Sequence, residues 1–430
     1  MNAVFLAAVL IAFAVAGYRQ IAVPPAAGTP APMDALGLAM IDAAKGSVTL
    51  AIGLVGVMAL FLGLMKVAEA GGLLAIIAKT VRPLMVRLFP EVPADHPAMG
   101  AMIMNISANV LGLGNAATPF GIRAMQELDK LNPHKGTATN AMAMFLAINT
   151  SSVTLLPTGV IALRASAGSA DPAGILPTTL FATICSTAVA ILAVKLYQRF
   201  AKPAEAYASD AEDAGNGAES ETDALPPEPS EPYPTWVSAC VLAAVVALIP
   251  VTILYGRDIA PWIIPGLMVA LLGFGALKGV RIYEVFVEGA KDGFNVALRI
   301  IPYLVAILVA VAMLRASGAL ELLITPLGAV TSLFGLPAEA LPMALLRPLS
   351  GSGAYGVLAS IIQDPATGPD TYVGFLVSTF QGSTETTFYV LAVYFGAVQI
   401  RRIRHALAAA LTADIAGIAA AVAITAYLFG

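Results

Sequence analysis

Charged residues are scarce in this sequence, since only 12% of its 430 positions hold Asp, Glu, Lys or Arg. A typical soluble domain carries about 25% charged residues, so this chain has too little charge to cover a surface that faces water. Cysteine is almost absent, and Cys185 and Cys240 both lie inside apolar runs without the spacing of metal ligands. We interpret both as small buried side chains. The sequence therefore excludes an ordinary soluble protein and predicts no metal site.

Histidine and the motifs of enzymes are equally sparse. The three histidines, His96, His134 and His405, fall at or beyond the ends of apolar runs, where we interpret them as surface residues. No H-E-x-x-H motif and no Walker A motif occurs, and no serine has an obvious general base. The charge pattern shows no basic stripe of the kind that binds nucleic acid. We therefore expect no enzyme activity, no cofactor, no ATP-driven transport by this chain alone and no nucleic-acid partner.

Apolar residues are what the chain has in abundance: 58% of it is hydrophobic, and the mean hydropathy is +0.83. Apolar runs of about 20 residues, the length that crosses a bilayer as a helix, recur along the chain. The first, residues 2–18, begins without Lys or Arg, so we interpret it as a retained span rather than a cleaved signal peptide. The pattern predicts an all-α polytopic protein of the cytoplasmic membrane, with the lipid bilayer around it.

A charged, proline-rich segment divides the chain. Residues 201–232 contain nine acidic residues and one Lys, a net charge of −8, although the whole chain carries only −4. A segment with so little apolar content does not form a core, so we interpret residues 201–233 as a disordered linker. It separates a first membrane half, residues 1–200, from a second, residues 234–430. Basic residues at the end of the run before the linker place the linker in the cytoplasm.

The two halves share an order of polar breaks. Residues 44–47 align with residues 290–293, and Gly72 falls on Gly318 at the same shift of 246 positions. The basic residues predict that the first repeat begins outside and ends inside, and that the second does the opposite. We therefore expect two inverted-topology repeats with broken or re-entrant helices at the midplane, as in many secondary transporters. A parallel arrangement is the alternative, and it requires that one span be miscounted.

Four polar segments lie at apparent membrane depth, two in each half. Polar backbone survives in a bilayer only where protein buries it or where it lines a wet cavity. We predict that the segments surround one cavity for a small polar solute; alternatively, their side chains only join helices through hydrogen bonds. The predicted binding residues are Asn105, Asn109, Asn115, Thr118, Asn149, Thr150, Ser151, Ser152, Arg347, Ser350, Ser352, Gln381, Ser383, Thr384 and Glu385.

Arg347 and Glu385 are the ionisable residues in this set, and ionisable residues inside a span point to function. They occupy neighbouring broken segments of one repeat, so we expect them to pair. In the functional interpretation, Glu385 takes up a coupling proton or Na⁺, and Arg347 orients it or holds an anionic group. Otherwise the two residues form a fixed structural ion pair. Asp414, in the last span, is a weaker candidate that we expect near the cytoplasmic end.

Two helix starts are expected to direct their positive ends into the cavity. Thr118-Pro119 combines a capping hydroxyl with Pro at the first helical position. A second helix is expected to start after Ser350 or Ser352. The partial positive charge of a helix N-terminus would favour an anionic group on the solute.

The same polar segments carry a resemblance to a known family. The first half resembles spore maturation protein A through N-x-x-A-N-x-L-G-L-G-N-A-A-T-P at 105–119 and F-L-A-I-N-T-S-S at 145–152. The second half resembles spore maturation protein B through L-R-P-L-S-G-S-G at 346–353 and Q-G-S-T-E-T-T-F-Y-V-L-A-V-Y-F-G at 381–396. The resemblance implies a fusion of two proteins of the nucleoside-recognition or Gate group. Members of this group are also found within ferrous iron transporter B.

This resemblance implies a membrane protein whose family is named for maturation of the spore, with a fold similar to that of concentrative nucleoside transporters. Together with the polar segments, it leads us to expect secondary transport of a nucleoside-like solute or a small carboxylate, coupled to H⁺ or Na⁺. The alternative is a non-transporting membrane scaffold or a platform for dimerisation, and a homodimer is compatible with either function.

Overall fold

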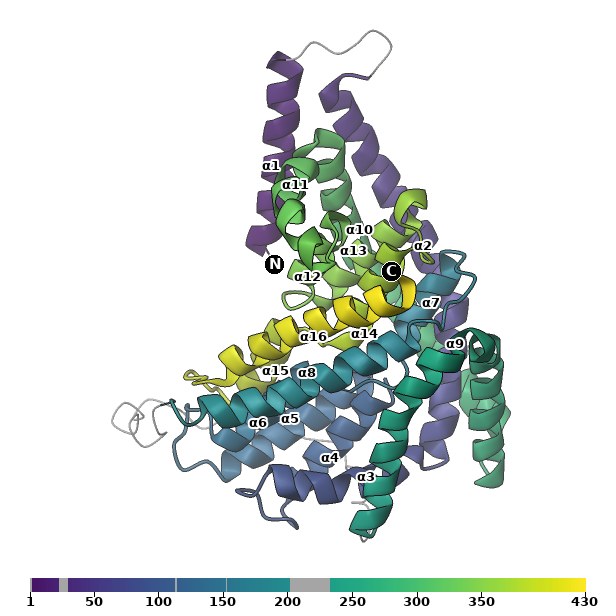
Figure 1. The fold of residues 1–430 in the computed structure, drawn as a ribbon, viewed down its shortest axis with the longest axis vertical. Helices are drawn as coiled ribbons and strands as arrows, with labels where there is room; N and C mark the ends of the chain where they lie inside the picture. The colour runs from purple at the N-terminus through teal and green to yellow at the C-terminus, as the bar shows by residue number, and fades with distance from the viewer. Residues whose placement is uncertain (1, 23–29, 113, 152, 202–232) are drawn as a thin grey trace.

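The protein is built from helices arranged as an elongated bundle (Figure 1). Its structure is a computed structural model that describes residues 2–22, 30–112, 114–151, 153–201 and 233–430. Within these residues, four helices are long and apolar enough to cross a membrane, and a fifth candidate is a helix pair bent by 109°. The prediction of an all-α polytopic membrane protein is confirmed, whereas nearly all of the predicted linker lies outside the described residues. The four helices are Phe5–Ala22, Pro32–Ala70, Leu176–Tyr197 and Ala406–Phe429, and the bent pair is Ile324–Phe334 with Ala338–Leu346.

The first half contains eight helices within the described residues. Long apolar helices stand at its beginning and end, and shorter helices separated by polar breaks lie between them. The helices are α1 (Asn2–Ala22), α2 (Pro32–Ala70), α3 (Leu73–Leu88), α4 (Pro97–Val110), α5 (Gly114–Lys130), α6 (Asn140–Thr150), α7 (Thr158–Ser166) and α8 (Leu176–Tyr197).

The second half shows the same order of long and shorter helices. Short 3-10 turns flank some of its helices, at residues 332–334, 338–340 and 365–367. The helices are α9 (Thr235–Leu277), α10 (Ile282–Ser317), α11 (Ala319–Thr331), α12 (Leu341–Leu346), α13 (Gly351–Gln363), α14 (Tyr372–Ser383), α15 (Thr387–Ala397) and α16 (Ala406–Phe429).

One local feature marks the same position in both halves. Gly72, between α2 and α3, has a φ of +84°, and Gly318, between α10 and α11, has a φ of +77°. Only glycine adopts this left-handed conformation without steric cost. The two glycines that align in the sequence therefore make the same sharp turn in the structure.

α2 and α10 pack along each other through small residues. Gly289 on α10 lies against Lys66 of α2, and Gly293, one turn further along α10, lies against Ala59. A Cβ at Gly293 would stand 2.6 Å from the Ala59 Cα, so this close approach depends on glycine. Residue numbers rise along one helix as they fall along the other, which makes α2 and α10 antiparallel.

α8 and α16 form a second antiparallel pair, and Figure 1 shows them side by side. The Ser186 hydroxyl donates to the Ala413 carbonyl at 2.9 Å near the middle of both helices. Ala193 shares a buried cluster with Ala406 at one end of the pair, and Ala182 shares another cluster with Ala421 toward the other end. The small side chains allow these two long apolar helices to lie close together.

The breaks between helices coincide with the four predicted polar segments. They separate α4 from α5, α6 from α7, α12 from α13, and α14 from α15. The predicted start of a helix after Ser350 is confirmed, because the Ser350 hydroxyl caps α13 by accepting from the Gly353 N–H at 3.0 Å.

The predicted helix start at Thr118-Pro119 is wrong. α5 already begins at Gly114, so Pro119 lies inside the helix. Proline lacks an N–H and therefore removes one hydrogen bond from the helix, but helices in a membrane tolerate proline where neighbouring groups satisfy the freed carbonyl. The Thr-Pro pair resembles a helix start because the same two residue types are favoured there.

Candidate functional site

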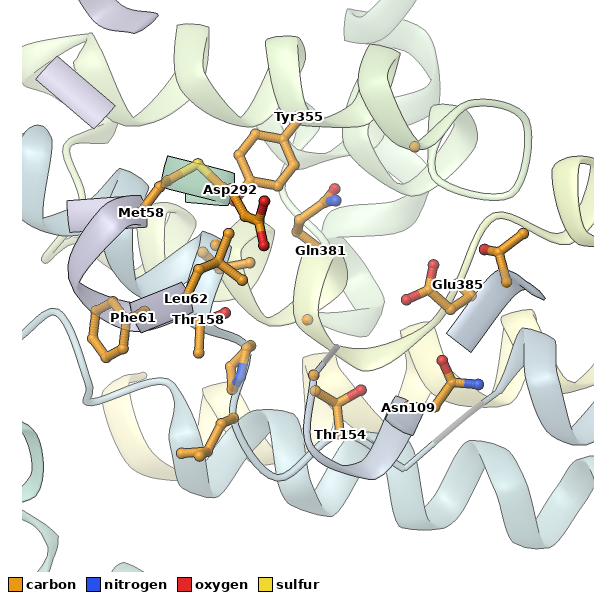
Figure 2. Close-up of a pocket in the computed structure, with 18 of the residues that line it drawn as sticks. Met58, Phe61, Leu62, Asn109, Thr154, Thr158, Asp292, Tyr355, Gln381 and Glu385 are labelled. Carbon is orange, nitrogen blue, oxygen red and sulfur yellow. The ribbon is translucent and has the colours of Figure 1, made fainter. Parts of the chain in front are cut away.

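A cavity of about 950 Å³ lies between the two halves. Its walls are α2 with α10, the segment 154–160 with the end of α4, and α13 with the break between α14 and α15. In Figure 2, the side chains of Asp292 and Glu385 lie on two sides of the same space, with Gln381 between them. The volume is that of pockets that bind small molecules, which measure about 300–1,000 Å³.

The cavity gathers predicted residues from both halves, and the rest of the predicted set surrounds it. Ser152 lies outside the described residues, and the side chain of Asn115 is likewise not described. The predicted residues that line the cavity are Asn109, Thr118, Arg347, Ser352, Gln381 and Glu385. The predicted residues that lie in or beside the neighbouring helices are Asn105, Asn149, Thr150, Ser151, Ser350, Ser383 and Thr384.

Arg347 and Glu385 pair, as the sequence predicted. Arg347 Nη2 lies 3.7 Å from Glu385 Oε2 and also donates to the carbonyl of Thr384. Arg347 Nη1 donates to Thr386 Oγ1 at 2.9 Å. The Arg347 side chain is 5% exposed, whereas the Glu385 side chain is 46% exposed. The buried guanidinium therefore stabilises the break between α14 and α15 through hydrogen bonds, and the more exposed carboxylate of Glu385 faces the cavity.

A buried network of amides joins the two halves beside the cavity. Asn105 Nδ2 donates to the Ala117 carbonyl at 2.8 Å and to Tyr394 Oη at 3.1 Å. Tyr394 Oη in turn lies 3.4 Å from Asn149 Oδ1, which also accepts from Asn109 Nδ2 at 3.0 Å. Tyr394 was not predicted as a site residue, because in the sequence it is one aromatic residue among the apolar residues of α15. The one sequence feature that distinguishes Tyr394 is its place in the 381–396 motif.

Backbone hydrogen bonds cross the breaks in a pattern that the halves share. In the first half, the Leu155 N–H donates to the Val110 carbonyl at 2.9 Å; in the second, the Phe388 N–H donates to the Pro348 carbonyl at 3.1 Å. The Glu385 N–H donates to the Thr150 carbonyl at 2.8 Å, which joins the two halves directly. Backbone N–H and C=O groups that lose their helical partners at one break thus form hydrogen bonds with backbone groups at another break. A low-dielectric environment requires such pairing.

Several predicted hydroxyl residues bond to their own helices. Thr150 and Ser151 donate to the Ala147 carbonyl, at 3.0 and 2.8 Å, and Ser383 donates to the Phe380 carbonyl at 3.3 Å. None of these three residues is part of the cavity wall. For them, the interpretation as residues that stabilise helix ends and packing fits better than solute binding.

Asp414 lies two turns inside α16 and is 3% exposed. Its Oδ2 accepts from Thr387 Oγ1 at 2.7 Å, while Oδ1 has no hydrogen-bond partner among the described residues. Asp414 does not line the cavity. Through Thr387, Asp414 contacts the start of α15. The neighbouring residue, Thr386, accepts a hydrogen bond from Arg347. We expected Asp414 near the cytoplasmic end of this span, whereas the structure buries it two turns inside the helix.

The lining residues that were absent from the predicted set include Lys66, Asp292 and Tyr355. Lys66 pairs with Glu69 at 3.5 Å on the same helix. Asp292 lies on α10, and the antiparallel contact of α10 with α2 brings it to the cavity. Tyr355 lies on α13, where its hydroxyl is buried and has no hydrogen-bond partner among the described residues.

Among the described residues, no group of three or more His, Cys, Asp or Glu side chains is close enough to hold a metal ion. The cavity instead offers amides, hydroxyls and carboxylates, which exchange hydrogen bonds and charge with an organic solute or an alkali cation.

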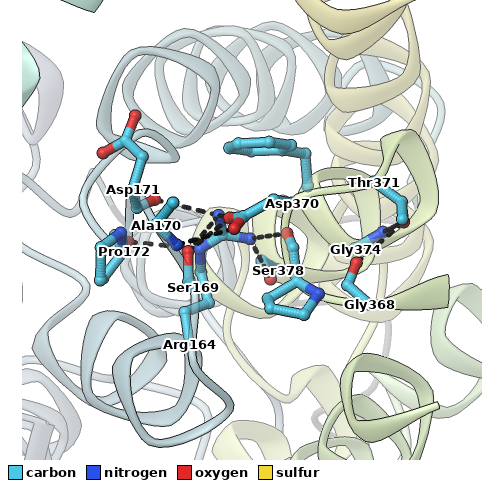
Figure 3. A network of polar contacts seen from close by, with 12 residues as sticks. Arg164, Ser169, Ala170, Asp171, Pro172, Gly368, Asp370, Thr371, Gly374 and Ser378 are labelled. Atoms are coloured by element: carbon cyan, nitrogen blue, oxygen red, sulfur yellow. Dashed lines mark hydrogen bonds and ion pairs between the residues drawn. The ribbon is translucent and has the colours of Figure 1, made fainter. Parts of the chain in front are cut away.

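A second polar cluster lies around Arg164, at the end of α7, and Figure 3 shows its contacts. Arg164 Nη2 lies 3.2 Å from Asp370 Oδ1, and the guanidinium also donates to Ser169 Oγ at 3.2 Å. Its side chain is 0% exposed and lies over the Phe375 ring, 4.3 Å from the centroid. Arg164 thereby joins the first half to the segment before α14. Nothing in the sequence distinguishes Arg164, because one Arg at the end of an apolar run is typical of a membrane surface.

The fold and the cavity define a class: a polytopic α-helical membrane protein with two repeated halves around a polar cavity. The chain belongs to the nucleoside-recognition family called Gate, whose model matches residues 51–167 and 297–401. This match covers parts of both halves and confirms the resemblance found in the sequence.

Two relatives from Bacillus subtilis are each similar to a part of this chain. Spore maturation protein B is 47% identical over 167 residues, which cover 39% of this chain and 93% of the relative. Spore maturation protein A is 47% identical over 154 residues, which cover 36% of this chain and 79% of the relative. These partial matches are consistent with a fusion of two such proteins.

A more distant relative is the inner membrane protein YjiG of Escherichia coli, 34% identical over 95 residues that cover 22% of this chain and 62% of the relative. No solved structure matches the chain. The comparisons thus establish a family of membrane proteins.

Proposed function

We propose that this chain is a secondary transporter that carries a small polar solute across the cytoplasmic membrane. The observation that carries the proposal is the polar cavity of about 950 Å³ between the two halves, at the meeting point of broken helices. The solute classes expected from the sequence are a nucleoside-like molecule or a small carboxylate. Coupling to H⁺ or Na⁺ is assigned to Glu385, whose carboxylate faces the cavity. An enzyme activity and a cofactor are not part of this proposal.

Inverted repeats are the second part of the proposal. α2 and α10 occupy equivalent places in the two halves and run antiparallel, and the same holds for α8 and α16. Equivalent helices that run in opposite directions are what an inverted repeat requires. In such transporters, rocking of one repeat against the other exposes a central site alternately to the two sides of the membrane.

The inverted arrangement predicts on which side of the membrane two equivalent loops lie. Topology reporters fused after residue 170, between α7 and α8, are expected to report the outside. Reporters fused after residue 400, between α15 and α16, are expected to report the cytoplasm, because Arg401, Arg402 and Arg404 follow. Alkaline phosphatase and green fluorescent protein fusions at both places measure this. Both loops on the same side would mean parallel repeats.

Transport itself is tested with purified protein in liposomes that are offered a mixture of radiolabelled or mass-resolved metabolites. We expect at least one polar solute to enter faster than into liposomes without protein. Asn109→Leu is expected to reduce that flux about ten-fold or more, because it removes a polar lining group and its hydrogen bond to Asn149.

The matched control for the flux assay is Asn140→Leu. Asn140 opens α6 and is half-buried, and its amide bonds to Glu91 and Arg404 away from the cavity, which it does not line, so this variant is expected to keep the wild-type flux. If the wild-type protein moves no solute from a broad mixture, the alternative function as a non-transporting scaffold or homodimer platform is favoured.

A further inference from the structure

The charges that line the cavity carry information about its solute. Resting on the proposed function, we infer that the cavity selects a solute with a cationic ammonium group, anchored by Asp292, in preference to a carboxylate. The sequence left two solute classes open, a nucleoside-like molecule and a small carboxylate. A preference for an ammonium group excludes the small carboxylate.

Arg347 is not available as a carboxylate receptor. Both of its Nη groups are engaged, one with Thr386 Oγ1 and the other with the Thr384 carbonyl and the Glu385 carboxylate. Only Nε lacks a partner among the described residues. An anion placed there would compete with Glu385, whose Oε2 is 3.7 Å from the same guanidinium. The expectation that Arg347 holds an anionic group is therefore not favoured by its surroundings.

The remaining charges of the cavity do not balance. Lys66 is paired with Glu69 at 3.5 Å, and Arg347 is paired with Glu385. Asp292 is then left over: it is exposed, and no ion pair reaches it from any residue that the structure describes. The lining thus carries one uncompensated negative charge, which attracts a cation and repels an anion.

Hydrogen-bonding groups near Asp292 also favour a solute with an ammonium group. Gln381 is 8% exposed, lines the cavity, and its Oε1 has no hydrogen-bond partner in the described part of the chain. Figure 2 shows Gln381 between Asp292 and Glu385. A buried acceptor without a partner is costly, and a donor on the solute would satisfy it. An ammonium group is a donor only, whereas a carboxylate is an acceptor only.

The N-terminus of α13 does not reverse this preference. Gly351 and Ser352 bring the first turn of that helix to the cavity wall, and a helix end carries about half a positive charge. Ser350 already accepts one of its N–H groups. The full charge of Asp292 therefore outweighs the helix end, and the free N–H groups suit a neutral oxygen of the solute, such as a hydroxyl.

Three probes on one scaffold isolate the effect of charge: tyramine, tyrosol and 4-hydroxyphenylacetate, which end in an ammonium, a hydroxyl and a carboxylate. Their binding to the full-length protein in detergent is measured by isothermal titration calorimetry. Tyramine is expected to bind about ten-fold more tightly than tyrosol, the scale of one charge-assisted hydrogen bond. 4-Hydroxyphenylacetate is expected to bind most weakly.

Two matched variants assign the preference to one residue. Asp292→Asn is expected to remove the difference between tyramine and tyrosol. Glu288→Gln makes the same change of charge one turn earlier on α10, at an exposed residue outside the cavity, and is expected to keep the difference. An unchanged preference in Asp292→Asn, tighter binding of 4-hydroxyphenylacetate than of tyramine, or no binding of tyramine overturns the inference.

The inference and the proposed function fail in different ways. If the liposomes take up a carboxylate from the metabolite mixture and tyramine does not bind, transport stands and the inference is wrong. If tyramine binds through Asp292 and no solute crosses the membrane, the inference stands and the transport function is wrong.

Discussion

Replacing Arg164 with methionine is expected to lower the free energy of unfolding by about 3–5 kcal/mol, the scale for removing one partner of a buried ion pair. The Arg164 side chain is 0% exposed, and its guanidinium contacts both the first half and the segment before α14. Methionine fills part of the volume but donates no hydrogen bond, so the carbonyls of Asp171, Pro172 and Pro369 lose a donor. Buried acceptors without a partner account for much of the cost.

The measurement is the midpoint of thermal unfolding in detergent, followed by tryptophan fluorescence and by the fraction that stays monodisperse. Arg315→Gln is the matched control, because Arg315 also pairs with an Asp, at 2.9 Å from Asp364, but both side chains are partly exposed, by 45% and 31%. An exposed pair contributes less than about 1 kcal/mol. Equal shifts in the two variants would show that the Arg164 cluster does not hold the halves together.

The order of helices and breaks could be predicted from the sequence because lipid imposes a simple rule. Apolar runs must be helical, and polar stretches within them must be broken and buried or wetted. For this reason the segments around Asn105, Asn149, Arg347 and Gln381 were located correctly at helix breaks. The pairing of Arg347 with Glu385 followed from the same rule, since a buried charge requires a partner.

Contacts between distant parts of the chain could not be predicted in this way. Tyr394 meets Asn105 across 289 positions of the sequence, and nothing in the local pattern of α15 distinguishes its hydroxyl from an interfacial one. Asp292 could not be assigned to the cavity from the sequence, because the close packing of Gly289 and Gly293 on α2 is visible only once α2 is in place. Arg164 escaped notice for the same reason, since its partners Pro369 and Asp370 come from the other half.

The role of Glu385 gives the second large expected effect. Glu385→Gln is expected to reduce the accumulation of solute against a gradient at least about ten-fold, because the amide cannot take up a proton and binds Na⁺ without charge compensation. Downhill exchange of the solute is expected to continue, and the pH dependence of uptake is expected to disappear. Liposomes with an imposed pH or Na⁺ gradient measure accumulation, and liposomes without a gradient measure exchange.

The structure also predicts that this variant remains folded, which keeps the transport result interpretable. Arg347 retains its bonds to the Thr384 carbonyl and to Thr386 when Glu385 is neutral, so the break between α14 and α15 keeps its main support. The Glu385 side chain is 46% exposed, and water in the cavity screens the charge that Arg347 keeps. Glu284→Gln, at an exposed residue of α10 outside the cavity, is the control and should accumulate solute like the wild type. Unchanged accumulation in Glu385→Gln would exclude Glu385 as the coupling site and make Asp414 the next candidate, because this carboxylate is buried and its Oδ1 has no partner among the described residues.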